Sequence, residues 1–147
     1  QCLYVLDLPE DLGGGRITLS VKNARTDIRI TPTGNTAEFA FHINCDAEIL
    51  EEYMPENLDN SQIAVINDLL SDSIRRDMEE ALELSIQQYG CDAVGLGRLA
   101  QKKHPELVRG REDQWPAILK DCTFPLTVEA KVTKIGVESD SSAIPAL

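Results

Sequence analysis

Strict alternation of apolar and polar residues between positions 37 and 49 is the clearest local pattern in the chain. Apolar or small residues occupy the odd positions from Ala37 to Ile49, and most even positions are polar, as at Glu38 and His42. A period of two predicts a strand with one buried and one exposed face. Sheets covered on one side are commonly antiparallel, so we expect the helices to form a single layer.

Two other segments show the same alternation. From Arg16 to Val21 the apolar residues lie at odd positions, whereas Ile28 and Ile30 lie at even positions. This change of phase predicts a strand interrupted by a bulge or kink within residues 23–27. A later alternating run over residues 126–132 predicts another strand, which would follow the helices.

Apolar residues three and four positions apart between residues 59 and 89 predict one long helix. Asp59 and Gln62 have the spacing of a capping box at its start, and Gly90 has the position of a C-terminal cap. The opposite face should be solvated, because it carries charged residues: Asp68, Asp72, Arg75, Arg76, Glu79, Glu80 and Glu83.

A second helix is expected from Asp92, as its cap, to Lys103, with Gly95 and Gly97 inside its first turns. Glycine in a helix costs about 1 kcal/mol relative to alanine, so these positions need a physical reason. Close helix packing or an unwound turn is the preferred interpretation. A phosphate cradle is the alternative, but the segment lacks the third glycine, the Lys-Ser/Thr ending and the preceding strand of known phosphate-binding motifs.

The region after this helix is expected to hold short helical pieces. Pro105 suits the first position of one piece, and Gly110 should end it. Trp115 should begin the last turn and act as a core anchor, because large aromatic residues dominate core energetics.

The order of strands, helices and a final strand predicts an α+β fold. We expect an antiparallel sheet with one face covered by a long helix and two or three short helices. The boundaries would be 1–15 as a linker from a missing preceding domain, 16–136 as a C-terminal α+β domain, and 137–147 as a flexible tail. One core should contain Phe39, Phe41, Ile43, Ile66, Leu70, Ile74, Val128 and Val132.

Composition narrows the classes of function. The chain of 147 residues has 25 acidic and 14 basic side chains and a net charge of -11, which disfavours binding to nucleic acid or anionic lipid. No apolar run reaches the roughly 18 residues of a membrane-spanning helix. The chain begins with Gln1 rather than Met, so we expect an excised or processed fragment that is itself soluble.

Catalytic and metal-binding motifs are absent from the sequence. It has no H-E-x-x-H, G-x-S-x-G or P-loop motif, and its cysteines and histidines do not have the spacing of zinc ligands. Four cysteines without zinc spacing are expected to be free and mostly buried, although they would allow three disulfide pairings. We therefore predict no catalytic residue, metal or cofactor.

Residues 89–107, Y-G-C-D-A-V-G-L-G-R-L-A-Q-K-K-H-P-E-L, then W-P-A-I-L and the closing strand, resemble the carboxy-terminal domain of the C-subunit lipoproteins of spore germinant receptors, the Ger(x)C family. The resemblance extends from Arg16 to Gly136. It departs from the family pattern at Val108, Leu119 and Ile135. The matching motif positions, with a structural or interaction role, are Asp92, Gly95, Gly97, Arg98, Lys102, Lys103, Pro105, Trp115 and Gly136.

The resemblance implies a non-enzymatic subunit that acts in receptor assembly or signalling during nutrient-triggered germination. Its partners would be membrane-embedded receptor subunits. It would be a lipoprotein on the extracytoplasmic side of the spore inner membrane, attached only through an N-terminal lipid anchor absent from this fragment.

Two functions from other classes remain open. A small-molecule-binding extracytoplasmic module would need a concave apolar pocket, for which the expected two-layer packing offers no obvious place. An enzyme would need converging polar groups, for which Asp92 and Arg98 near Trp115 are the candidates.

Overall fold

The computed structural model describes residues 2–50 and 58–135, which form two compact units. Unit 1 combines residues 2–25, 43–50, 58–74 and 128–135, and unit 2 combines residues 26–42 and 75–127. The predicted tail over 137–147 and Gly136 lie outside the described residues.

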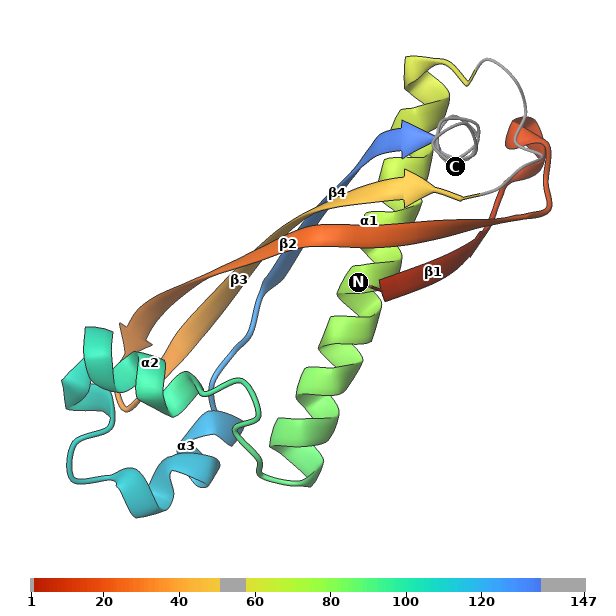
Figure 1. The fold of residues 1–147 in the computed structure, drawn as a ribbon. Helices are drawn as coiled ribbons and strands as arrows, with labels where there is room; N and C mark the ends of the chain where they lie inside the picture. Colours follow the sequence, from red (N-terminus) through yellow and green to blue (C-terminus); the bar gives the residue numbers. More distant parts are fainter. Residues whose placement is uncertain (1, 51–57, 136–147) are drawn as a thin grey trace, which may run out of the picture. The chain divides into compact units, whose positions relative to one another are not determined.

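Four strands make up one sheet (Figure 1) in the order β1-β2-β3-β4. They are β1 (Cys2–Asp7), β2 (Arg16–Thr33), β3 (Thr36–Ile49) and β4 (Leu126–Ile135). The helices are α1 (Asn60–Leu82), the π-helix η2 (Glu83–Gln88), α2 (Leu96–Lys103) and α3 (Trp115–Lys120). Short 3-10 turns are η1 (Glu10–Leu12), η3 (Pro105–Leu107) and η4 (Glu112–Gln114).

The α+β class is confirmed, but the sheet is mixed rather than wholly antiparallel. Glu38 and Thr123 form a parallel bridge just before β4. The Phe39 N–H donates to the carbonyl of Thr123 at 2.8 Å, and the Phe41 N–H donates to that of Pro125 at 2.8 Å. Parallel neighbours require a long crossover, which the helical segment between β3 and β4 supplies.

The expectation that residues 1–15 form a linker outside the folded domain is wrong for residues 2–15. Strand β1 pairs antiparallel with β2, with Leu6 opposite Ile17, and Leu8 and Leu12 are buried. Gly13, Gly14 and Gly15 have positive φ values, which glycine adopts without strain, and the Leu8 N–H donates to the Gly15 carbonyl at 2.9 Å. The glycines that suggested a joint therefore lie in the connection between two paired strands, directly after η1 (Glu10–Leu12).

Strands β2 and β3 confirm the alternation read from the sequence. All odd positions of β3 from Ala37 to Ile49 are buried. In β2 the buried apolar side chains change from odd to even positions, and Asn23 within the predicted interval has a φ of 56°. The predicted irregularity is therefore confirmed.

Helix α1 begins as the capping box predicts. The Gln62 N–H donates to Asp59 Oδ1 at 2.8 Å, and the Asp59 N–H donates to Gln62 Oε1 at 2.9 Å. The Ser61 hydroxyl also donates to Asp59 Oδ1, and this bond is the main cause of a lowered pKa for the Asp59 carboxyl.

Within unit 1, α1 also supplies hydrogen-bond acceptors to β4, which is an edge strand. The Ala130 N–H donates to Ser71 Oγ at 2.9 Å, and the Val132 N–H donates to Asn67 Oδ1 at 2.8 Å. The amides of residues two apart in a strand, such as Ala130 and Val132, point in the same direction. Side chains four apart in a helix, such as Asn67 and Ser71, lie on the same face, so the two acceptors line up with the two donors. Helix side chains thus satisfy amides that an edge strand would otherwise expose.

The predicted single core is divided between the two units. Phe39 and Phe41 are buried in unit 2, whereas the other buried members of that set, Ile43, Ile66, Leu70 and Ile74, belong to unit 1. Val128 and Val132 in unit 1 are only half-buried. The sequence pattern correctly indicates most of the buried side chains in this set. It does not indicate to which of the two units each side chain belongs.

All four cysteines are free, as predicted, but only two are buried. Burial raises the pKa of the Cys45 and Cys122 thiols. Cys2 and Cys91 are exposed. Thiols with raised pKa values carry little thiolate at neutral pH, so Cys45 and Cys122 should be inert core residues.

Candidate functional site

Asp92 organises the start of α2 in unit 2. The Leu96 N–H donates to Asp92 Oδ1 at 2.7 Å, and the Gly97 N–H donates to Asp92 Oδ2 at 2.7 Å. Asp92 therefore caps the helix, as predicted, but it does so from four residues before Leu96. Residues 93 and 94 form a turn and Gly95, with a φ of 80°, is the last residue before the helix.

Trp115 completes this cluster, which we call the Asp92 junction: Asp92, Leu96, Gly97 and Trp115. The Trp115 side chain is 7% exposed, and its Nε1–H donates to Asp92 Oδ2 at 3.0 Å. Its ring packs edge-on against Phe39, with 6.4 Å between ring centroids. The prediction that Trp115 is a core anchor is confirmed.

Gly97 lies where two helices come into close contact. A Cβ at this position would be 2.7 Å from Trp115 Nε1 and 3.2 Å from Asp92 Oδ2. The geometry fits the close-packing interpretation of this glycine, and Gly95 fits that of an unwound turn. The amides of Leu96 and Gly97, which a phosphate cradle would need, already donate to Asp92.

The other motif residues are more dispersed. Arg98 is exposed on α2, and Pro105 begins η3, as predicted. Gly136 lies outside the described residues. The structure thus brings Asp92, Gly97 and Trp115 together, with Gly95 and Arg98 next to Leu96 and Gly97 in the chain, whereas Pro105 belongs to η3.

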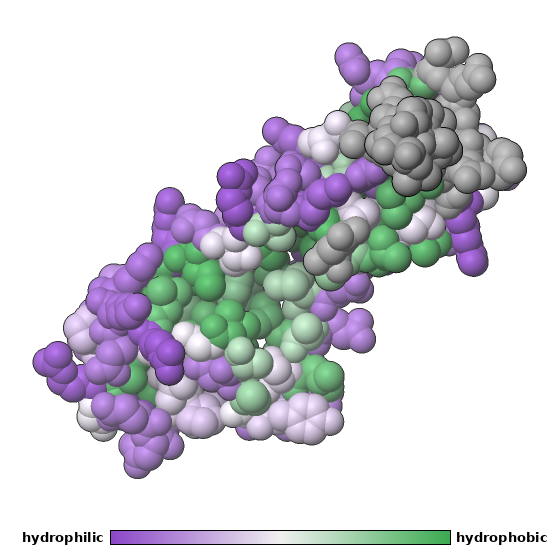
Figure 2. Space-filling model, viewed as in Figure 1, coloured by the Kyte–Doolittle hydropathy of each residue, from purple (hydrophilic) through white to green (hydrophobic). Residues whose placement is uncertain are grey.

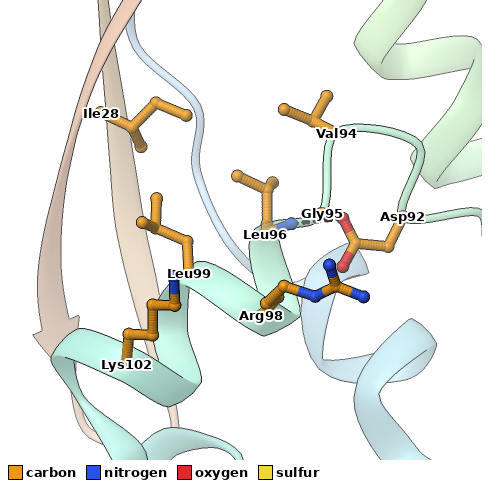
Figure 3. Close-up of a pocket in the computed structure, with 8 residues that line it drawn as sticks. All are labelled: Ile28, Asp92, Val94, Gly95, Leu96, Arg98, Leu99 and Lys102. Atoms are coloured by element: carbon orange, nitrogen blue, oxygen red, sulfur yellow. Dashed lines mark hydrogen bonds between the residues drawn. The ribbon is translucent and has the colours of Figure 1, made fainter.

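Beside the junction, unit 2 has a hollow of about 580 Å³. We call it the α2 hollow, and it is lined by Ile28, Asp92, Val94, Gly95, Leu96, Arg98, Leu99 and Lys102 (Figure 3). The expected two-layer packing offered no obvious place for a pocket, whereas the structure has this open hollow. The i, i+4 spacing of Arg98 and Lys102 could have indicated that they share a helix face. No local pattern in the sequence indicates that Ile28 of β2 lies beside them.

The polar groups considered for an enzyme site are partly engaged in hydrogen bonds within the fold. Both Asp92 oxygens accept hydrogen bonds from N–H groups, so the carboxylate acts as a structural acceptor.

Among residues 2–50 and 58–135, no group of three or more His, Cys, Asp or Glu side chains could hold a metal ion. No helix in these residues is long and apolar enough to cross a membrane.

A comparison with known families decides the classification. The family described as spore germination B3/GerAC-like, C-terminal, matches residues 3–136. The chain belongs to this family. The match includes β1 as well as the motif region, so the family domain begins upstream of the Arg16 boundary expected from the resemblance.

A solved structure supports the fold of this GerAC-like domain. The crystal structure of the GerBC protein superposes with a TM-score of 0.71 at 18% sequence identity, over 90% of this chain. The chain covers 41% of the GerBC chain. No curated protein matches the sequence.

Replacing Gly97 with alanine tests the close packing in this GerAC-like domain. The added methyl would displace Trp115 or break its bond to Asp92, and overpacking of this kind costs about 1–3 kcal/mol. The gain in helix propensity, about 1 kcal/mol, opposes this cost. We expect Gly97→Ala to lower the free energy of unfolding, measured by urea denaturation.

The matched control is Gln101→Ala, at an exposed position of the same helix. It should change the free energy of unfolding by no more than about 0.5 kcal/mol. A stabilised Gly97→Ala variant would contradict the packing interpretation. Saturable nucleotide binding that this variant loses would instead support a phosphate cradle.

Proposed function

We propose that this GerAC-like domain is a non-enzymatic part of a germinant receptor subunit, where it acts in receptor assembly or signalling during nutrient-triggered spore germination. The observation that carries the proposal is the family match over residues 3–136. The fold shared with the GerBC protein supports it. The junction residues support a structural role for the motif, because their polar atoms bond to one another.

In this proposal the subunit is a lipoprotein on the extracytoplasmic side of the spore inner membrane, and its partners are membrane-embedded receptor subunits. A net charge of -11 disfavours direct binding of this domain to anionic lipid. A single lipid chain gives only marginal membrane binding, so protein contacts would supply a second attachment.

The exposed side of α1 and η2 in unit 2 is a surface that could take part. Glu79, Glu80 and Glu83 are exposed there, and Leu84 beside them is 45% exposed. We call these four residues the acidic α1 surface. On the face seen in Figure 2, hydrophilic side chains gather mainly toward the margins and apolar side chains occupy much of the middle. Leu84 is an exposed apolar side chain with exposed charged side chains around it. This arrangement is compatible with a protein–protein contact that has an apolar centre and a polar rim.

Charge reversal on this surface tests the proposal. Glu79→Lys with Glu83→Lys should leave folding nearly intact, because the Arg75–Glu79 ion pair is exposed and worth about 1 kcal/mol at most. We expect the reversal to weaken co-purification of the intact subunit with its membrane-embedded partners from spores. The matched control, Glu112→Lys with Asp113→Lys, makes the same charge change on η4 and should leave recovery unchanged.

A deletion provides the decisive comparison. Intact subunit and subunit lacking this domain would be expressed in spores, and both partner recovery and nutrient response would be measured. Loss of either supports the proposal. Unchanged recovery and unchanged nutrient response after deletion would refute a role in receptor assembly or signalling.

A further inference from the structure

Part of the lining of the α2 hollow is apolar, and this part comes from three segments of unit 2. Ile28 comes from β2, Val94 from the turn before α2, and Leu96 and Leu99 from α2. The side chains of Ile28 and Leu99 extend toward the same space (Figure 3). Val94 is 50% exposed and Ile28 and Leu99 are half-buried, so these three side chains can meet a ligand from solvent, whereas Leu96 is buried behind them.

Two cationic side chains complete the lining. Arg98 and Lys102 are four residues apart on α2, so they lie on one side of the helix. Neither makes a hydrogen bond or ion pair with another described residue. The whole chain has a net charge of -11. Arg98 and Lys102 have no partner among the described residues and lie beside aliphatic side chains, so they form a local site with a positive charge.

The carboxylate of Asp92 does not cancel this positive charge. Of the described residues that line the hollow, only Asp92 is acidic, against two cations. Its oxygens accept three N–H bonds, from Leu96, Gly97 and Trp115, which stabilise its negative charge. The lining thus keeps a net positive charge and an apolar wall.

We propose that the α2 hollow binds a small organic acid, with one carboxylate on an aliphatic chain of a few carbons. The carboxylate would pair with Arg98 and Lys102, and the chain would lie against Ile28, Val94 and Leu99. The volume of about 580 Å³ is within the range of ligand pockets, roughly 300–1,000 Å³, and the hollow is open to solvent with a lining that is part apolar and part polar. This inference goes beyond the assembly or signalling function and does not depend on it.

Butanoate, hexanoate and octanoate are the probes, titrated into the isotopically labelled chain and followed by amide chemical shifts. Saturable shifts should centre on residues 94–99 and Ile28. Affinity should rise about three- to fourfold for each methylene buried. Hexan-1-ol, which has the same chain without the charge, should bind more weakly than hexanoate.

Variants separate a real site from general attraction to cations. Arg98→Gln and Lys102→Gln should each weaken hexanoate binding about two- to fivefold, which is the range for exposed ion pairs. The matched control is Lys103→Gln, because Lys103 is exposed on the same helix but does not line the hollow. Val94→Ala should reduce the increase in affinity per methylene of the ligand, because it removes apolar surface from the hollow. The charge of the hollow stays the same.

The proposal fails if octanoate gives no saturable shifts at millimolar concentration. It also fails if Lys103→Gln weakens binding as much as Lys102→Gln, or if hexan-1-ol binds as well as hexanoate. Shifts at the same amides from an acidic peptide, with none from octanoate, would overturn it in favour of a protein-docking surface.

Discussion

Replacing Phe39 with alanine is expected to lower the free energy of unfolding by about 3–5 kcal/mol, the cost of removing a fully buried phenylalanine. The Phe39 side chain is 0% exposed in the core of unit 2. It stacks on Phe124 with 5.7 Å between ring centroids and meets the Trp115 ring edge-on. Truncation would remove both aromatic contacts and leave a cavity that the surrounding strand and helices cannot fully close.

Urea denaturation followed by tryptophan fluorescence provides the measurement, because Trp115 is the single tryptophan and lies in the same core. The matched control is Glu38→Ala, at the adjacent exposed position of β3. The control should change the free energy of unfolding by no more than about 0.5 kcal/mol. A loss below about 1 kcal/mol for Phe39→Ala would contradict the assignment of this residue to the core.

The features predicted correctly from the sequence are those that local physical chemistry determines. The alternation along β3 correctly identifies its buried positions because successive side chains of a strand point to opposite faces. The Asp59–Gln62 capping box is confirmed in both of its hydrogen bonds because its members are three residues apart. Neither feature depends on which distant segment lies alongside.

The errors arise where partners are distant in sequence. Nothing in the alternation of β4 indicates that it runs parallel to β3, because direction depends on the path of the helical crossover. The run Leu3–Leu8 has no strict alternation, and only pairing with β2 explains its place in the sheet. The division of the buried residues into two units likewise depends on contacts between segments far apart along the chain.

The candidate site shows the same limit. Residue type and spacing identified Asp92 as a cap, the glycines as packing or turn positions, and Trp115 as a core anchor. The bond between Asp92 and Trp115 joins residues 23 positions apart, and no pattern in the sequence links them. This one contact brings the acid and the aromatic residue of the motif together beside Gly97.

Replacing Asp92 with alanine is therefore expected to have a second large effect. The N–H groups of Leu96 and Gly97 would lose their cap, and the buried Trp115 Nε1–H would lose its acceptor. Loss of a helix cap costs about 0.5–2 kcal/mol and an unsatisfied buried donor about 1–3 kcal/mol, so the free energy of unfolding should fall by roughly 2–4 kcal/mol. Urea denaturation would measure the loss, and the Trp115 emission should shift to the red as water reaches the indole.

A double-mutant cycle isolates the bond to the indole from the helix cap. Trp115→Phe keeps an aromatic ring but removes the N–H donor, so the cost of Asp92→Ala should be smaller in that background. Residues that share a hydrogen bond commonly show coupling of about 0.5–3 kcal/mol, measured here by far-UV circular dichroism because the variant lacks tryptophan. Asp113→Ala, at an exposed acid on η4, is the control and should be nearly neutral. If the effects of the two substitutions were strictly additive, Asp92 would stabilise the protein only as the cap of α2. The close packing at Gly97 would then need an explanation other than the Asp92–Trp115 bond.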